Sequence, residues 1–267
     1  MAEIEGPIRF KGSIGDVTCY YNSVLKKWIF RKKGGAHKNH IKKSKKFKNV
    51  RLNMSEFKAC GEWCHLVRMG LFKLDDFNWG LYMSGIVQLS KTIQLMDGEG
   101  LWGNRNIESS KHKEMLTDIV FNAQYPFNKV VMRRPEVIAD EMRMSITVNL
   151  TQFYSLRELV FRKGFSSYRF AMTIAQLSDY VYDPVNKEYA PKHAGLENRS
   201  VVVFSEWFRK GANPGDISLS AAFPPEFVPP SDATVMVGLG VEFATNLSGN
   251  SYYSAKGDRT MKLVDCL

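Results

Sequence analysis

The sequence has few cysteines and no long apolar segment. Four cysteines in 267 residues are too few for a disulfide framework. The longest run without a charged residue, residues 77–90, is too short and too polar to span a bilayer. The first seven residues lack the basic start and apolar run of a secretory signal. We therefore expect no membrane insertion, and a protein that is cytoplasmic or belongs to a particle assembled in the cytoplasm.

Glycine-rich and nucleophile motifs of common enzymes are also missing. The sequence contains neither a G-x-S-x-G nucleophile elbow nor a G-K-[ST] phosphate loop. Gly98-Glu-Gly100 follows a predicted helix, and Gly238-Leu-Gly240 lies within a predicted strand. Neither is followed by a helix that could hold a phosphate. We interpret Gly238 and Gly240 as positions of close backbone approach or of a β-bulge.

A few polar side chains could still carry chemistry. Cys60, Cys64 and His65 could supply three zinc ligands, but both cysteines lie on the apolar stripe of a predicted helix, which favours packing in the core. Neighbouring carboxylates could work as acid–base pairs, although such pairs are common on surfaces. We expect no enzymatic activity, no metal and no cofactor. The carboxylate groups are Asp179 with Asp183, and Glu136 with Asp140 and Glu141.

The unusual feature of the chain is a stretch without acidic residues, since no Asp or Glu occurs between Asp16 and Glu56. Twelve Lys and Arg residues lie in residues 26–51. Subtracting these twelve charges from the net charge of +10 leaves the rest of the chain at −2, so the basicity belongs to this segment. Its basic residues are Lys26, Lys27, Arg31, Lys32, Lys33, Lys38, Lys42, Lys43, Lys45, Lys46, Lys48 and Arg51.

A block of like charge repels itself and becomes favourable next to phosphates or a carboxylate-rich protein surface. The aromatic residues within it, among them Trp28, Phe30 and Phe47, could stack on bases or anchor the segment to its own domain. A third interpretation is a solvated basic loop. Most of the basic residues in the segment are lysines, and a lysine acts as a point charge. Sequence-specific recognition of bases is therefore the least favoured form of nucleic-acid binding.

Local patterns predict a hairpin, a basic arm and helices in the first half of the chain. β-rich runs around a turn predict a hairpin within residues 8–33. Residues 34–50 have too few apolar positions for a packed element. Apolar spacings of three and four predict helices from an N-cap at Ser55 to Gly70, from residue 82 to 98, and from 109 to 121. The buried stripe of the first helix is predicted to be Phe57, Cys60, Cys64, Val67 and Leu71.

After Pro126 the pattern changes to short strands between Pro- and Gly-containing turns, which is typical of an antiparallel β-sandwich. The fold class is therefore α+β, with an N-terminal hairpin and basic arm, a helical hairpin and a C-terminal β-sandwich. The predicted domains are 1–33, 34–52, 53–125 and 126–267. The predicted strands are 144–150, 168–174, 178–182, 188–189, 200–204, 217–223, 234–244 and 260–264.

Five short motifs, in the same order along the chain, resemble those of a group of uncharacterised proteins from Bacteroidota and their mobile elements. The resemblance implies a short hairpin ending in Arg-x-Lys-Gly-Gly, a helical stretch and a β-rich half, and it implies no catalytic residue. The basic run is denser here than in that group. The motifs are Gly12-Ser-Ile-Gly-Asp-Val-Thr-Cys-Tyr-Tyr21, Trp28-Ile-Phe-Arg-Lys-Lys-Gly-Gly35, Arg51-Leu-Asn-Met-Ser-Glu-Phe57, Gly103-Asn-Arg-Asn-Ile107 and the strand from Val237 to Phe243.

These observations predict a non-catalytic structural or assembly protein. Its basic segment would dock on an acidic partner, such as a neighbouring copy or another component of a larger, phage- or mobile-element-related assembly. The alternative is a nucleic-acid-binding protein that contacts phosphates through the same segment without sequence specificity.

Overall fold

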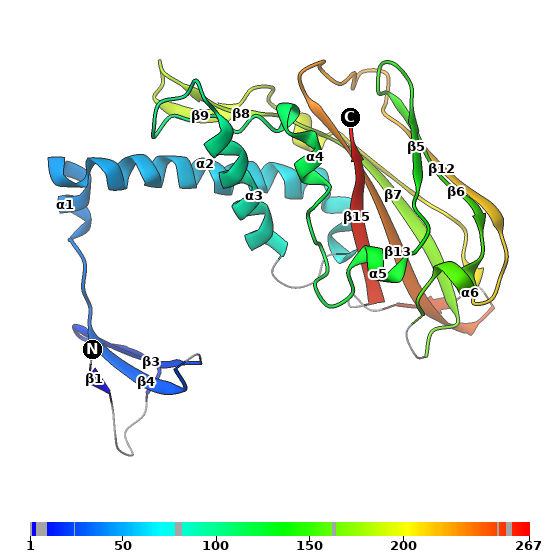
Figure 1. Ribbon diagram of the computed structural model, residues 1–267, viewed down its shortest axis with the longest axis horizontal. Helices are drawn as coiled ribbons and strands as arrows, with labels where there is room; N and C mark the ends of the chain where they lie inside the picture. Colours follow the sequence, from blue (N-terminus) through cyan, green and yellow to red (C-terminus); the bar gives the residue numbers. More distant parts are fainter. Residues whose placement is uncertain are drawn as a thin grey trace. The chain divides into compact units, whose positions relative to one another are not determined.

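The computed structural model describes residues 2–3, 10–23, 25–77, 82–161, 164–249, 251–254 and 258–267. The chain forms two compact units, Met1–Arg51 and Leu52–Leu267. The fold class is α+β with antiparallel sheets and an N-terminal hairpin, which confirms the class that the sequence predicts (Figure 1).

The first unit contains a four-stranded antiparallel sheet in the order β1-β4-β3-β2. Its centre is the predicted hairpin, in which Tyr20 pairs with Ile29. Among the described residues of this unit, the buried apolar side chains are Cys19 and Ile29. The strands are β1 (Ala2–Glu3), β2 (Gly12–Ile14), β3 (Val17–Asn22) and β4 (Lys27–Lys32).

The segment predicted as an arm without a packed element is helical in the structure. It forms α1 (Lys38–Lys43) and η1 (Lys45–Phe47), and no residue of either is buried. Local hydrogen bonds explain why a helix forms without apolar anchors. The Ser44 hydroxyl accepts a bond from the Lys46 N–H, and Arg51 Nη1 donates to the carbonyl oxygens of Ile41 and Ser44, both at 2.7 Å.

Two long helices follow, α2 (Lys48–Gly70) and α3 (Tyr82–Met96). The predicted end of the first helix at Gly70 is confirmed, but its predicted start at Ser55 is wrong by seven residues. Lys and Arg are good helix formers, so the helix extends back into the basic residues where no apolar stripe marks it. The predicted burial of Phe57 is also wrong, because this side chain is 62% exposed.

The third predicted helix is broken into η3 (Ser109–Lys111) and α4 (Lys113–Leu116). A distant contact explains the break. The carboxylate of Asp179 accepts a hydrogen bond from the Ser110 N–H at 2.9 Å, which fixes the chain in a short turn before α4. The remaining short helical elements are η2 (Phe72–Phe77), α5 (Phe127–Val130), α6 (Ser155–Glu158) and η4 (Leu196–Asn198).

The predicted strand segments all correspond to strands, which form a large sheet, a small sheet and a hairpin. Three strands of this half, Glu136–Ala139, Phe208–Arg209 and Ser251–Tyr253, were not predicted, since none is longer than four residues. The large sheet contains β10 (Ser200–Phe204), β7 (Ser167–Leu177), β13 (Thr234–Ser248), β14 (Ser251–Tyr253), β11 (Phe208–Arg209) and β15 (Arg259–Cys266). The small sheet contains β12 (Gly215–Ala222), β6 (Ser145–Phe153) and β5 (Glu136–Ala139), and the hairpin is β8 (Tyr180–Asp183) with β9 (Glu188–Pro191).

The second unit has three layers, because the large sheet is covered on both faces (Figure 1). Alternate residues of β7 and β13, such as Met172 and Leu239, pack against β6 and β12 in one core cluster. The residues between them, such as Ala175 and Met236, pack against α2 and α3 in a second cluster. Burial on both faces explains why these strands are almost continuously apolar.

Gly238 and Gly240 in β13 confirm the interpretation as positions of close approach. A Cβ at Gly238 would lie 2.7 Å from Thr173 Cγ2, and one at Gly240 would lie 2.7 Å from Phe77 Cδ1. The pairing of β13 with β15 also shifts register between Val237 and Gly238. Glycine is required because the neighbouring groups occupy the space of a side chain.

Gly61 in α2 and Gly85 in α3 lie in exposed, open positions, and a methyl group added at either would have no atom within 4 Å. Glycine in the middle of a helix is less stable than alanine because it loses more backbone entropy. We expect Gly61→Ala and Gly85→Ala each to raise the free energy of unfolding by about 0.5–1 kcal/mol in urea titrations. Gly70→Ala is the control, since its methyl group would lie 3.2 Å from Met236 Cε, and it should give no gain. A loss of stability in the first two variants would contradict this account.

Candidate functional site

The twelve basic residues of the segment 26–51 lie on the surface of the first unit. Eleven of them are exposed, and Arg51 is half-buried. The whole unit contains fourteen Lys and Arg residues against three Asp and Glu residues, which gives a net charge of +11. Within the described residues, the amines of its six central lysines form no ion pair with a carboxylate. These are Lys38, Lys42, Lys43, Lys45, Lys46 and Lys48.

The aromatic rings of the basic segment contact other rings of the same unit. Phe30 meets Phe10 edge-on with 6.2 Å between ring centroids, and Trp28 meets Tyr21 at 5.6 Å. Phe47 contacts His40 in the same way at 5.4 Å. The contacts with Phe10 and Tyr21 reach outside the segment, which favours the interpretation that its rings anchor it to its own domain rather than serving as a stacking platform for bases.

Cys60, Cys64 and His65 do not converge on a common point. Both cysteines are fully buried in the core, and burial raises the pKa of both thiols, that of Cys64 to about 12. Their sulfur atoms lie near polar groups of α3, namely Gln94 Oε1 at 3.5 Å and Ser90 Oγ at 3.8 Å. His65 is exposed. Packing in the core is therefore confirmed, and the described part of the chain has no group of three or more metal-ligating side chains.

Three of the five carboxylates considered as acid–base candidates have structural partners. Asp179 is buried and accepts hydrogen bonds from the hydroxyls of Ser109 and Ser110 at 3.1 and 2.5 Å. Asp183 accepts the Val185 N–H at 2.8 Å in the turn between β8 and β9. Asp140 accepts two backbone N–H groups after β5, those of Met144 and Ser145, while Glu136 and Glu141 are exposed.

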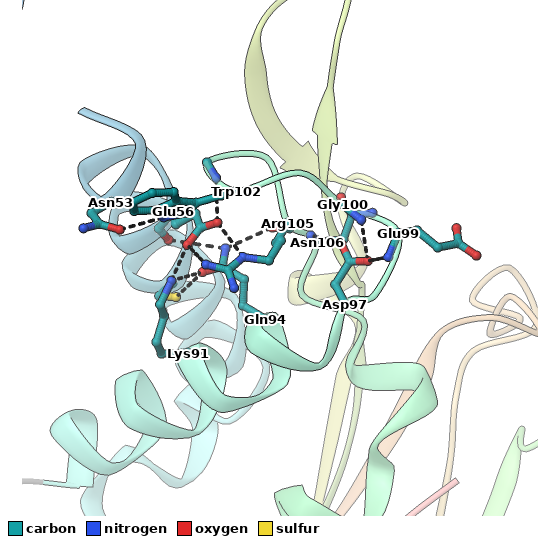
Figure 2. Close-up of polar contacts among 12 residues, drawn as sticks. Asn53, Glu56, Lys91, Gln94, Asp97, Glu99, Gly100, Trp102, Arg105 and Asn106 are labelled. Carbon is teal, nitrogen blue, oxygen red and sulfur yellow. Dashed lines mark hydrogen bonds and ion pairs between the residues drawn. The ribbon is translucent and has the colours of Figure 1, made fainter. Parts of the chain in front are cut away.

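A buried ion-pair network, which the sequence did not predict, centres on Glu56 of α2 (Figure 2). Arg105 binds this carboxylate with two hydrogen bonds, from Nε to Oε1 and from Nη2 to Oε2, both at 2.8 Å. The Gly103 N–H donates to Oε1 at 2.8 Å, and Lys91 Nζ of α3 contacts Oε2. The network therefore joins α2, α3 and the loop that follows α3.

Further hydrogen bonds fix both ends of this loop. The Gln94 side chain receives a bond from Lys91 Nζ at 2.9 Å and donates to the Arg105 carbonyl oxygen at 3.0 Å. Asp97 accepts the backbone N–H groups of Glu99, Gly100 and Asn106 (Figure 2). Burial alone would raise the pKa of Asp97, but these three bonds lower it.

Glu56 stays ionised inside the network. Burial alone would raise the pKa of its carboxyl group, but the hydrogen bonds from Arg105, Lys91 and the Gly103 N–H outweigh burial and lower the pKa to about 2. One feature of the sequence could have indicated this site: Glu56 lies four residues before Cys60, so helical spacing places it on the buried side of α2. The partners of Glu56 could not be predicted from the sequence, since Lys91 and Arg105 are 35 and 49 residues away.

The loop held by Glu56 exposes two apolar side chains, and one of them, Trp102, lies beside α2. Trp102 donates its indole N–H to Asn53 Oδ1 at 2.9 Å and is 47% exposed, and the adjacent Leu101 is 78% exposed (Figure 2). Met54 and Phe57 of α2 are 59% and 62% exposed. We call these four residues, Met54, Phe57, Leu101 and Trp102, the Trp102 face.

The fold and these two sites define an α+β protein with a strongly basic N-terminal unit and a larger unit that carries an exposed apolar face. Comparisons with protein-family models, curated proteins and solved structures find no match to this chain. The resemblance to the Bacteroidota group therefore remains a prediction. Within the described residues, no helix has the length and apolar character needed to cross a membrane.

Proposed function

We propose that this protein is a non-catalytic assembly protein whose basic segment, residues 26–51, binds an acidic partner within a larger assembly. The observation that carries the proposal is the set of eleven exposed cations in a stretch without any Asp or Glu. Such a surface repels itself in the free protein and gains free energy next to negative charge.

The start of α2 adds to this argument. The N-terminal end of a helix carries a partial positive charge and is normally stabilised by acidic residues. The first turn of α2 has none, and it begins at Lys48 and includes Arg51. The first turn of α2 therefore concentrates positive charge without an acidic residue of its own, which supports an external acidic group as the partner.

A carboxylate-rich protein surface suits this segment better than a nucleic acid, because Trp28, Phe30 and Phe47 are half-buried and each contacts another ring of the unit, which leaves less of each ring for base stacking. Nucleic acid is the second candidate, since the six central lysines are exposed and could bind phosphates without sequence specificity. The resemblance to proteins of mobile elements is the reason for proposing a phage- or mobile-element-related assembly.

A six-lysine variant tests the proposal. Lys38, Lys42, Lys43, Lys45, Lys46 and Lys48 are changed to Gln in the full chain, and binding to labelled polyglutamate is followed by fluorescence anisotropy. Each exposed charge pair contributes about 0.2–1 kcal/mol, so we expect the affinity to fall about tenfold or more. Binding of the unchanged protein should weaken as the salt concentration rises.

The matched control replaces the same six lysines by Arg, which keeps the charge and should keep the affinity. Equal binding by the Gln variant would overturn the proposal. The ultraviolet spectrum of the purified protein separates the two candidate partners. Co-purifying nucleic acid that is released at high salt, and a log–log salt slope of about −0.9 per phosphate on duplex DNA, would favour the second candidate.

A further inference from the structure

The larger unit contains a cavity of about 360 Å³ between the edges of its two packed sheets. One wall is β15, the strand at one edge of the large sheet, and the opposite wall is the segment 131–135, which leads into β5 at the edge of the small sheet. The third wall is α5, which contacts β15 and lies between β15 and β5 in Figure 1. Sites for small molecules have volumes of about 300–1,000 Å³, so a cavity of this size can hold one.

Part of the cavity wall is apolar. Phe127 and Val131 are 5% and 4% exposed and belong to the core cluster between the two sheets. Val264 of β15 packs against the same cluster. An apolar wall favours a ligand with an apolar body, because binding removes that body from water.

The remaining wall is positively charged. Among the described residues, three cations and no carboxylate line this cavity, namely Arg133, Arg134 and Lys262. Arg133 is already engaged, since its Nη2 donates to the Thr151 carbonyl oxygen at 2.6 Å and its Nε lies 3.4 Å from Glu158 Oε1. Within the part of the chain that the structure describes, Arg134 and Lys262 form no ion pair and no side-chain hydrogen bond. Two positive charges are therefore available to a ligand.

These two cations come from opposite walls. Lys262 lies in β15, and Arg134 lies two residues before the start of β5. Their like charges repel each other, whereas an anion between them would attract both. The side chain of Asn128 lines the same cavity and can donate hydrogen bonds to the oxygen atoms of an anion. Asp118 lines a neighbouring cavity that shares Lys262 and Asn128, so the anion is expected on the Arg134 side.

We propose that this cavity binds a small organic anion. Its carboxylate or phosphate group would lie between Arg134 and Lys262, and its apolar body would pack against Phe127 and Val131. All lining residues belong to the larger unit and none to the basic segment, so the proposal goes beyond the proposed function and does not depend on it.

Four probes test the proposal by isothermal titration calorimetry. Benzoate and phenyl phosphate carry a ring and an anionic group, benzyl alcohol carries the ring alone, and inorganic phosphate carries the anionic group alone. The protein is the full chain with the six central lysines of the basic segment changed to Gln, because that segment would also attract anions. We expect benzoate or phenyl phosphate to bind about tenfold more tightly than benzyl alcohol. Inorganic phosphate should bind more weakly than phenyl phosphate, and the tighter of the two ring-bearing anions identifies the preferred anionic group.

Two substitutions assign the binding to this cavity. Arg134→Gln and Lys262→Gln should each weaken binding of the preferred anion about tenfold and leave binding of benzyl alcohol unchanged. Lys129→Gln is the matched control, since Lys129 is exposed on α5 and does not line the cavity.

The proposal is overturned if none of the probes binds, if benzyl alcohol binds as tightly as both ring-bearing anions, or if inorganic phosphate binds as tightly as phenyl phosphate. Unchanged anion binding in either the Arg134 or the Lys262 variant would also overturn it. The comparison of the four probes needs no substitution in the cavity, so it decides the question even if a cavity variant fails to fold.

Discussion

Glu56→Ala is expected to lower the free energy of unfolding by about 3–5 kcal/mol, because it leaves the charges of Arg105 and Lys91 without their buried carboxylate. The effect should lie toward the lower end of this range, since the Arg105 and Lys91 side chains are 19% and 32% exposed and can reach water. Urea unfolding measures the change. Glu99→Ala is the control, because Glu99 is exposed on the same loop, and it should change stability by less than about 0.5 kcal/mol.

The same carboxylate predicts a pH dependence. The pKa of Glu56 is lowered from its ordinary value of 4.5 to about 2 in the folded protein. Its contribution to stability is therefore complete above pH 4.5 and is lost as the pH falls toward 2, by about 3 kcal/mol in total. Glu56→Gln should lack this part of the pH dependence between pH 4.5 and 2. An unchanged pH profile in this variant would show that Glu56 is not held as an ion.

Gly240→Val is expected to destabilise the fold, because it adds a side chain where β13 touches Phe77. Its Cβ would lie 2.7 Å from Phe77 Cδ1 and 3.3 Å from Met261 Cβ, inside a core that is packed on both faces of the sheet. Overpacking of this kind lowers the free energy of unfolding by about 1–3 kcal/mol. Thermal and urea unfolding of the full chain measure it.

A double-mutant cycle identifies the cause of this loss. Phe77→Leu shortens the opposing side chain, so the pair Gly240→Val with Phe77→Leu should be more stable than the sum of the two single changes predicts. Gly98→Ala is the control, since nothing lies within 4 Å of its Cβ position. Additive effects in the cycle would contradict a steric contact between residues 77 and 240.

The strands were predictable because β-branched runs between Pro and Gly turns specify a strand locally. The burial of β7 and β13 on both faces could not be predicted from the sequence, since it depends on the layers that pack on either side of the sheet. Helix ends were less predictable. The start of α2 lies among basic residues that extend the helix without an apolar stripe, and the break after Lys111 is set by Asp179, which lies 69 residues from Ser110.

The two candidate sites also differ in how far the sequence predicts them. The basic segment was visible in full, because charge along the chain needs no fold to be counted. The Trp102 face was missed because Phe57 lies three residues before Cys60, a spacing that predicts burial on the same stripe. In the structure the buried side of α2 instead includes Glu56, Cys60, Trp63 and Val67, which leaves Phe57 on the flank.

The partition of charge between the two units has a consequence for how copies of the protein behave together. The unit Met1–Arg51 has a net charge of +11 and the whole chain has a net charge of +10, so the unit Leu52–Leu267 has a net charge of −1. Mutual repulsion between free copies therefore originates almost entirely in the first unit, and proteins near zero net charge associate readily. A partner that neutralises the basic segment would remove this repulsion at the same moment as it binds. The positive charge of the first unit would then keep free copies apart, and its neutralisation would let copies bound to the partner lie close together.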